Sequence, residues 1–321
     1  MIMINPSVET QRGGTHSCPP GERGFRGAEA QHEISQRLFG FPLAQKLSRE
    51  VLDFYGNHLV YLESRNFPST IFTLRLQHQP IFLKSAEIHL QLGTDRVAEA
   101  LAHELLHLRL FILGFPLGEF VQIPFPFVPY AQEFIGMCHW VINLVQHEMN
   151  YQDFVALGFD KNHFLVRFHE IIDYQERFSQ EFHNRVPAQV DFPRWCIEFL
   201  RHFSAARHGG GEESLDQAQD ALLWGSRLYP RLRVVTAEIR RWFEMGFFND
   251  PANYPGQINF LLELMKIPKF TGWARIELSP QKKPMAVRLE PRFFLNPEWW
   301  ESDFWETPFG IQWFQEGLEK N

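Results

Sequence analysis

Residues 96–114 read RVAEALAHELLHLRLFILG, and this stretch decides the fold that we expect around it. Ala and Leu favour helices, and apolar residues recur along the stretch at helical spacing. Before it, Gly93 ends an apolar run, and residues 94–95 are Thr and Asp, whose side chains suit the cap of a helix. Gly114 and Pro116 are typical of a helix end. The sequence therefore predicts one long, largely buried helix over this stretch.

The chain before this helix carries two runs that are typical of β-strands. Residues 69–76 and 81–92 are rich in Ile, Leu and Phe and partly alternate apolar with polar side chains. Two shorter helices are predicted before them, over residues 33–39 and 42–55, because a Gly separates them and a Pro opens the second. We therefore expect a small sheet next to the long helix.

The chain after the long helix changes character several times. Residues 115–129 contain four prolines among Phe, Val and Ile, which argues against a helix or a central strand and predicts an apolar loop. A second long helix is predicted over residues 130–157, and several more over residues 162–267. Two strand-like runs near the end, residues 272–278 and 285–290, predict a β-hairpin.

Together these elements predict a mainly α-helical α+β fold. We expect a flexible tail over residues 1–30, because this segment is rich in Gly, Pro, Ser and Arg and has no apolar periodicity. Residues 31–160 form the predicted core, with the sheet and the long helix. Residues 161–321 form a mostly helical region that packs on this core and ends in the hairpin. The composition, 45% hydrophobic and 15% aromatic, is that of a packed globular protein.

Charge, cysteine content and the first residues exclude several classes of function. The formal net charge of -7 disfavours binding to a phosphate backbone. Three cysteines without a C-x-x-C pair indicate neither a disulfide framework nor a cysteine zinc site. Residues 1–10 lack the basic and apolar regions of a secretory signal, and no apolar stretch reaches the roughly 20 residues of a membrane span. We therefore expect a cytoplasmic protein with no nucleic-acid or membrane partner.

The long helix carries the motif H-E-x-x-H at residues 103–107. Helix residues four apart lie about 40° apart around the axis, so His103 and His107 can converge on one ion. Glu104 is rotated about 100° from His103 and therefore stands beside the ion, where a general base can deprotonate a metal-bound water. Ionisable groups on so apolar a helix need partners that offset their desolvation, and a metal ion provides one.

With this motif the chain resembles the zincin metallopeptidases, whose active helix carries His-Glu-x-x-His and whose preceding edge strand aligns the substrate backbone. The resemblance covers about residues 80–150. It implies a zincin-like core, Zn²⁺ bound by His103 and His107, Glu104 as the general base, and a peptide or protein substrate. The longer metzincin motif is absent, because both of its further positions are Leu here. A third zinc ligand must therefore come from elsewhere.

The helix predicted over residues 130–157 is the natural source of this ligand, since a catalytic zinc takes three protein ligands and one open position. We favour His147, because Asn143 and Tyr151 lie one turn before and after it and could hold the imidazoles in one tautomer. Some zincins use a glutamate as third ligand, and this resemblance would point to Glu148 or Glu133 instead. The remaining candidates on this helix are Glu133, His139 and Glu148.

The resulting hypothesis is a zinc-dependent peptidase in which zinc lowers the pKa of its bound water toward about 7 and Glu104 accepts the proton. A metal-dependent hydrolase of a small amide or ester would use the same residues. A zinc-binding regulatory or interaction protein without turnover is a further alternative, although the intact Glu104 disfavours it. A helical scaffold with a chance motif would bind no metal.

Overall fold

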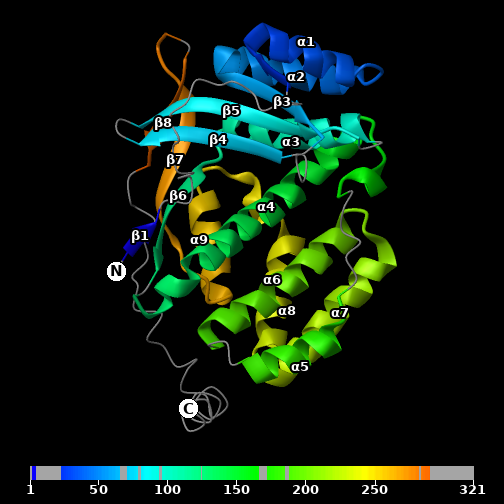
Figure 1. The fold of residues 1–321 in the computed structure, drawn as a ribbon, viewed down its shortest axis with the longest axis vertical. Helices are drawn as coiled ribbons and strands as arrows, with labels where there is room; N and C mark the ends of the chain where they lie inside the picture. The colour runs from blue at the N-terminus through cyan, green and yellow to red at the C-terminus, as the bar shows by residue number, and fades with distance from the viewer. Residues whose placement is uncertain are drawn as a thin grey trace.

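The structure is a computed structural model that describes residues 2–4, 23–65, 71–78, 81–93, 96–123, 125–165, 172–184, 188–281 and 283–289. Helices dominate it, and small sheets lie beside them, which confirms a mainly helical α+β fold (Figure 1). The helices are α1 (Gly27–Arg37), α2 (Pro42–Tyr55), α3 (Val97–Ile112), α4 (Ala131–Ala156), α5 (Tyr174–Asn184), α6 (Ala188–Arg207), α7 (Gly211–Leu228), α8 (Leu232–Met245) and α9 (Tyr254–Leu264). The strands are β1 (Ile2–Ile4), β2 (Arg23–Arg26), β3 (Leu59–Ser64), β4 (Ile71–His78), β5 (Ile81–Gln91), β6 (Leu117–Ile123), β7 (Phe270–Leu278) and β8 (Pro284–Arg288).

The first sheet has the order β2-β3-β5-β4 and packs against α1, α2 and α3. Strand β3 runs parallel to β5, whereas β4 is antiparallel to β5 and lies at the edge of the described sheet. Apolar side chains of its strands, such as Ile88 and Leu90, share one buried core with Leu101 and Leu105 of α3. Helix α3 therefore lies against the sheet next to its edge strand.

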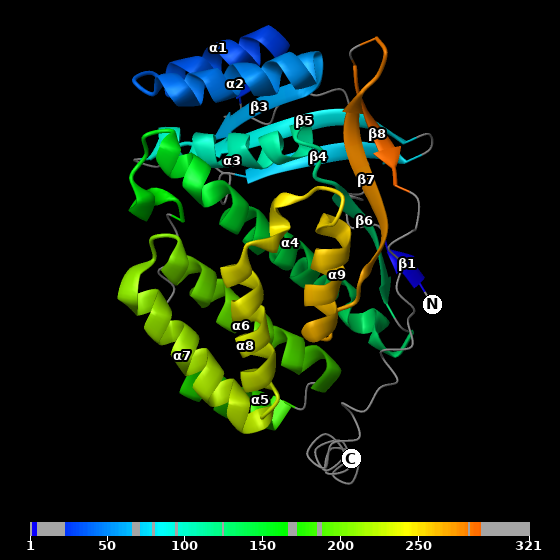
Figure 2. The ribbon, with the colours of Figure 1, turned by 180° about the vertical axis from the view of Figure 1, so that it is seen from behind.

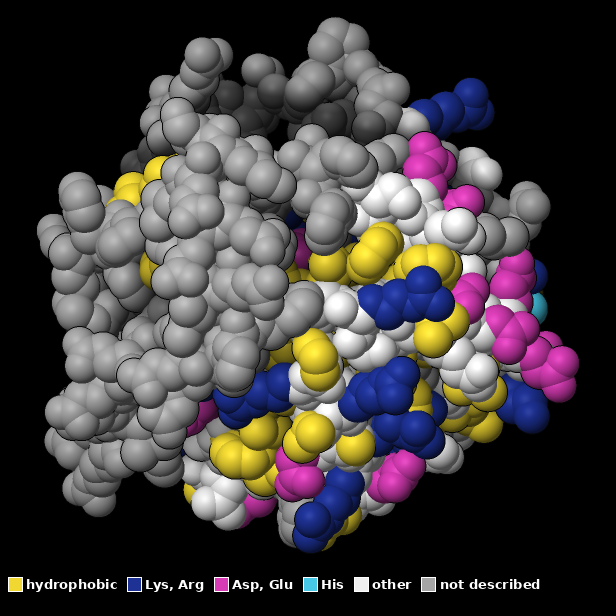
Figure 3. Space-filling model, turned by 90° about the horizontal axis from the view of Figure 1, so that it is seen from below, with side chains coloured by type: hydrophobic (Ala, Val, Ile, Leu, Met, Phe, Trp, Pro, Cys, Tyr) yellow, Lys and Arg dark blue, Asp and Glu magenta, His cyan; other side chains and the backbone are white. Residues whose placement is uncertain are grey.

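The second sheet has the order β1-β6-β7-β8 and shares a separate core with helices α4 to α9. Helix α4 runs diagonally across the molecule and reaches α3 near its upper end (Figures 1 and 2). Strands β5 and β8 lie in contact where the two sheets meet. Seen from below, the described part of the surface mixes Lys and Arg side chains with hydrophobic ones (Figure 3). None of the described helices is both long and apolar enough to span a membrane.

Helix α3 matches the helix that residues 96–114 predict. It ends at Ile112, where the N–H of Gly114 bonds the carbonyl of Phe111 and Gly114 takes a φ of 90°, a conformation that suits glycine. Two side-chain hydrogen bonds join the helix to α2 and α4. The Tyr55 hydroxyl donates to the carbonyl of Leu108, and Arg109 donates to Asp153 of α4 over 2.7 Å.

Residues 115–129 differ from the predicted apolar loop. Strand β6 occupies the centre of this segment and pairs with β1 on one side and β7 on the other. Pro116 and Pro124 stand immediately outside the strand, so its seven residues keep every backbone N–H for pairing. The prolines therefore delimit a strand, and the prediction of a loop over the whole segment was wrong.

The start of the chain also differs from a flexible tail over residues 1–30. Strand β1 pairs with β6, strand β2 pairs with β3, and α1 already begins at Gly27. Residues 5–22 of the predicted tail lie outside the described residues. The predicted hairpin near the C-terminus exists as β7 and β8, but it extends the second sheet instead of standing alone. There are thus two sheets in the described chain, where the sequence predicted one sheet and a separate hairpin.

Candidate metal centre

Three histidines meet where α3 and α4 cross. His103 and His107 lie one turn apart on α3, and His147 faces them from α4. One nitrogen from each ring lies within 4.8 Å of the other two, which forms a group that could hold a metal ion. The Nε2 atoms of His103 and His107 are 3.1 Å apart. Two nitrogens that each lie 2.0–2.1 Å from a tetrahedral zinc would be separated by about 3.3 Å, so the spacing of this pair fits the ion.

Burial keeps these imidazoles neutral. The pKa of His107 falls to about 4, because burial disfavours the charged ring more than the hydrogen bond to Gln146 favours it. Burial and the neighbouring imidazoles lower the pKa of His103 and His147 well below 6.5. A neutral imidazole offers the lone pair that a metal needs. The three rings are therefore in the metal-binding form at neutral pH.

Aromatic side chains enclose the three histidines. The ring of Phe72, from β4, stacks on His107 at a centroid distance of 5.0 Å. The ring of Phe164, which follows α4, lies 4.7 Å from His103 and 5.4 Å from His147. Apolar walls lower the local dielectric, so a charge inside them interacts strongly with its neighbours. A divalent cation at this position would be bound in a sheltered site.

Gln146 contacts the centre from the position before His147. Its Oε1 lies 2.9 Å from Nδ1 of His107, and the side chain is buried. The sequence reasoning missed this residue, since it expected Asn143 and Tyr151 to orient the rings. Tyr151 instead packs against Phe164. Only the position of Gln146 beside the favoured ligand could have indicated its role.

Glu104, the residue after His103 on α3, binds the edge strand β4. Its Oε2 accepts a hydrogen bond of 3.0 Å from the backbone N–H of Phe72. Burial raises the pKa of Glu104 to about 8, and the hydrogen bond from Phe72 opposes this shift only in part. A cation nearby would favour the carboxylate over the neutral acid. The carboxyl group is thus poised to hold or release a proton near neutral pH.

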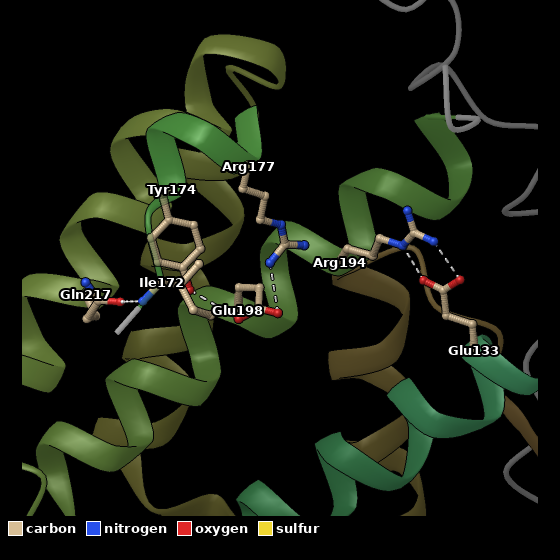
Figure 4. A network of polar contacts seen from close by, with 7 residues as sticks. All are labelled: Glu133, Ile172, Tyr174, Arg177, Arg194, Glu198 and Gln217. Atoms are coloured by element: carbon tan, nitrogen blue, oxygen red, sulfur yellow. Dashed lines mark hydrogen bonds and ion pairs between the residues drawn. The ribbon is translucent and has the colours of Figure 1, made fainter. Parts of the chain in front are cut away.

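The two glutamates considered as ligands bind arginines of α6. Glu148 accepts hydrogen bonds of 2.8 and 3.1 Å from Arg207, and its carboxylate also lies 3.3 Å from Nε2 of His208. Glu133 forms a two-pronged ion pair with Arg194, near the N-terminal end of α4 (Figure 4). Arginine satisfies a carboxylate with parallel hydrogen bonds. Both glutamates are therefore occupied by ion pairs that join α4 to α6.

The structure brings His103, His107 and His147 together. Glu104 follows His103 on α3, and its carboxyl group binds the N–H of Phe72. His139, the other histidine considered on α4, is exposed. The donor set of three neutral imidazoles suits Zn²⁺, and it also suits other divalent transition metals.

No protein-family model, curated protein or solved structure is significantly similar to this chain.

Proposed function

We propose that the protein is a zinc-dependent hydrolase, and that its substrates are peptides. The observation that carries the proposal is the meeting of His103, His107 and His147 at the crossing of two buried helices, with a buried carboxyl group on the same helix. Three protein ligands leave one position of a tetrahedral zinc open for water. Structural zinc sites, in contrast, are usually closed by a fourth protein ligand.

The three histidines and Glu104 would have different roles in hydrolysis. The three imidazoles would hold the ion, which when bound lowers the pKa of a coordinated water and polarises a carbonyl group. Glu104 would accept the proton from that water and later deliver it to the leaving amine. Its pKa of about 8 without a metal falls as a cation approaches, so the base is ionised when the ion is present. Phe72 and Phe164 would restrict access of bulk water.

The edge position of β4 supports a peptide as the substrate. Strand β4 is the last strand of the described sheet on this side, and its Phe72 N–H binds Glu104 instead of a neighbouring strand. An extended peptide can pair with an exposed strand edge through its backbone, in any sequence context. Such pairing would bring a peptide carbonyl next to the residues of the metal centre. This arrangement resembles that of the zincins, and it supports the same assignment.

A zinc-binding protein without turnover is the second candidate. The observation that favours it is the enclosure of the site, since the ring of Phe164 lies against two of the three imidazoles. A small amide or ester would reach such a site more readily than a folded protein. Both alternatives predict bound zinc, and only the peptidase predicts cleavage of peptides.

The test begins with elemental analysis of the purified protein. We expect one zinc per chain, and no zinc in a variant that combines His103→Ala with His107→Ala. Incubation with a mixed peptide library, read by mass spectrometry, should then show cleavage products that Glu104→Gln does not form. Zinc without cleavage of peptides would favour the non-catalytic candidate or a hydrolase of small amides or esters, which a screen of such substrates separates. Absence of any stoichiometric transition metal, even after reconstitution, would refute a metal-dependent function.

A further inference from the structure

The contact between Gln146 and His107 differs from the other contacts of the metal centre, because it fixes a proton. The carbonyl oxygen of the Gln146 amide can only accept a hydrogen bond, so at 2.9 Å it requires a proton on Nδ1 of His107. In a neutral imidazole only one nitrogen carries a proton. The Nε2 atom, which faces His103, therefore keeps its lone pair for a metal.

The other two imidazoles have no such partner at Nδ1 among the described residues. The Nδ1 atoms of His103 and His147 are buried and form no hydrogen bond of normal geometry with any described residue. The backbone of Phe164 lies near His103 and acts to raise its pKa against the lowering by burial, but Nδ1 of His103 forms no hydrogen bond of normal geometry with it. Among the described contacts of the three imidazoles, that of His107 with Gln146 is thus the one in which a side chain binds the Nδ1 atom.

The position of Gln146 makes this contact depend on helix packing. Gln146 and His147 are consecutive on α4, about 100° apart around its axis, and both are buried at the crossing with α3. The Gln146 amide also lies close to the buried hydroxyl of Tyr254 in α9, whose pKa burial raises and the amide partly lowers. The packing of α4 against α3 therefore positions both His147 and Gln146, the partner of His107.

We propose that Gln146 is a positioning residue that holds His107 in the Nδ1–H tautomer and thereby raises the metal affinity of the centre. This inference rests on the metal centre of the proposed function, but it does not require that the protein cleaves peptides. Partners of this kind typically change metal affinity by about 10- to 100-fold when they are removed. A side chain that only filled space would have no comparable effect once its volume was restored.

The test measures the zinc dissociation constant by competition with a chromophoric chelator. Gln146→Met keeps the length and the unbranched shape of the side chain but removes the acceptor, and we expect binding about 10 to 100 times weaker. Gln146→Glu keeps an acceptor at the same place, and we expect it to bind zinc at least as tightly as the unchanged protein. Gln217 of α7 accepts a hydrogen bond from the backbone of Ile172 (Figure 4), and α7 contributes no residue to the three-histidine group, so Gln217→Met serves as the matched control.

A second readout reports the tautomer itself. Long-range ¹H–¹⁵N spectra of the metal-free protein should show His107 protonated on Nδ1, and Gln146→Met should change that pattern while Gln217→Met does not. If Gln146→Met bound zinc as tightly as the unchanged protein, or if Gln146→Glu lost as much affinity as Gln146→Met, the positioning role would be refuted. Failure of the unchanged protein to bind zinc would instead refute the metal centre, and this role with it.

Discussion

Helix α4 offers a direct comparison between its two sides. On one side, Gln146 and His147 face α3 and meet two more histidines beside apolar rings, and none of the described Lys or Arg side chains pairs with the ring nitrogens. On the other side, Glu133 and Glu148 meet arginines of α6. Neutral nitrogen donors that converge without a counter-charge suit a cation from solution. Carboxylates that already bind arginines need no cation from solution, and their ion pairs join the two helices.

The largest test of this comparison contrasts two neighbours in the sequence. His147→Ala should weaken zinc binding about 1,000-fold or more, because the ion loses one of three protein ligands. Glu148→Ala should change zinc affinity less than about threefold, since its carboxylate binds Arg207 and not the ion. Titration against a chelator of known affinity measures both. An equal loss in the two variants would show that the two sides of α4 are not functionally distinct.

Removal of the metal is the next test. Zinc at a free concentration about 100 times its dissociation constant should stabilise the folded protein by about 2.7 kcal/mol, because it binds the native state alone. A chelator should therefore lower the midpoint of thermal unfolding. We expect Arg207→Ala to retain this response to the chelator, whereas the His103→Ala, His107→Ala variant should lack it. A chelator-induced shift of the same size in that variant would contradict the site.

The pH dependence of the metal-free protein tests the buried carboxyl group. Since the pKa of Glu104 is raised from 4.5 to about 8, the folded protein binds its proton more tightly than the unfolded chain does. Stability from this group is present below about pH 4.5 and is lost as the pH rises toward 8. Histidines with lowered pKa act in the opposite direction, but only below about 6.5.

Between pH 6.5 and 8 the Glu104 effect should therefore dominate, at about 1.4 kcal/mol per pH unit or about 2 kcal/mol over the window. Urea unfolding at several pH values measures it. Glu104→Gln should remove this slope, because glutamine does not titrate. A slope that persists unchanged in Glu104→Gln would show that another group causes it.

The smallest expected effect concerns the ion pairs on the α6 side. Arg194→Ala should lower the free energy of unfolding by about 1 kcal/mol or less, because both partners of this pair are partly exposed. Zinc affinity should not change. Calorimetry and the same chelator titration measure the two quantities. If Arg194→Ala lost zinc, the ion pair with Glu133 would contribute to zinc binding, and the two sides of α4 would not be functionally distinct.

Local patterns predicted much of the fold. Helix α2 begins at Pro42, the proline that predicted its start, and ends at Tyr55, and α3 matches its apolar stretch. Strand β3 escaped prediction, because a short apolar run after a helix is ambiguous until its partner is known. That partner, β5, pairs with it in parallel, and each pair of facing residues, such as Leu59 and Ala86, is 27 residues apart in the sequence. Strand β6 was hidden by the prolines that flank it.

The sequence by itself determined the part of the centre that one helix can define. The spacing of His103 and His107 brings both rings to one side of α3 wherever that helix lies, because the geometry of a helix is local. Only the tertiary structure decided which residue of α4 completes the group, since His147 and Glu148 differ by one position and about 100° of rotation. Where α4 crosses α3, His147 and Gln146 face His103 and His107. Glu148 instead binds Arg207 of α6. That choice depends on packing between distant segments, which local spacing does not encode.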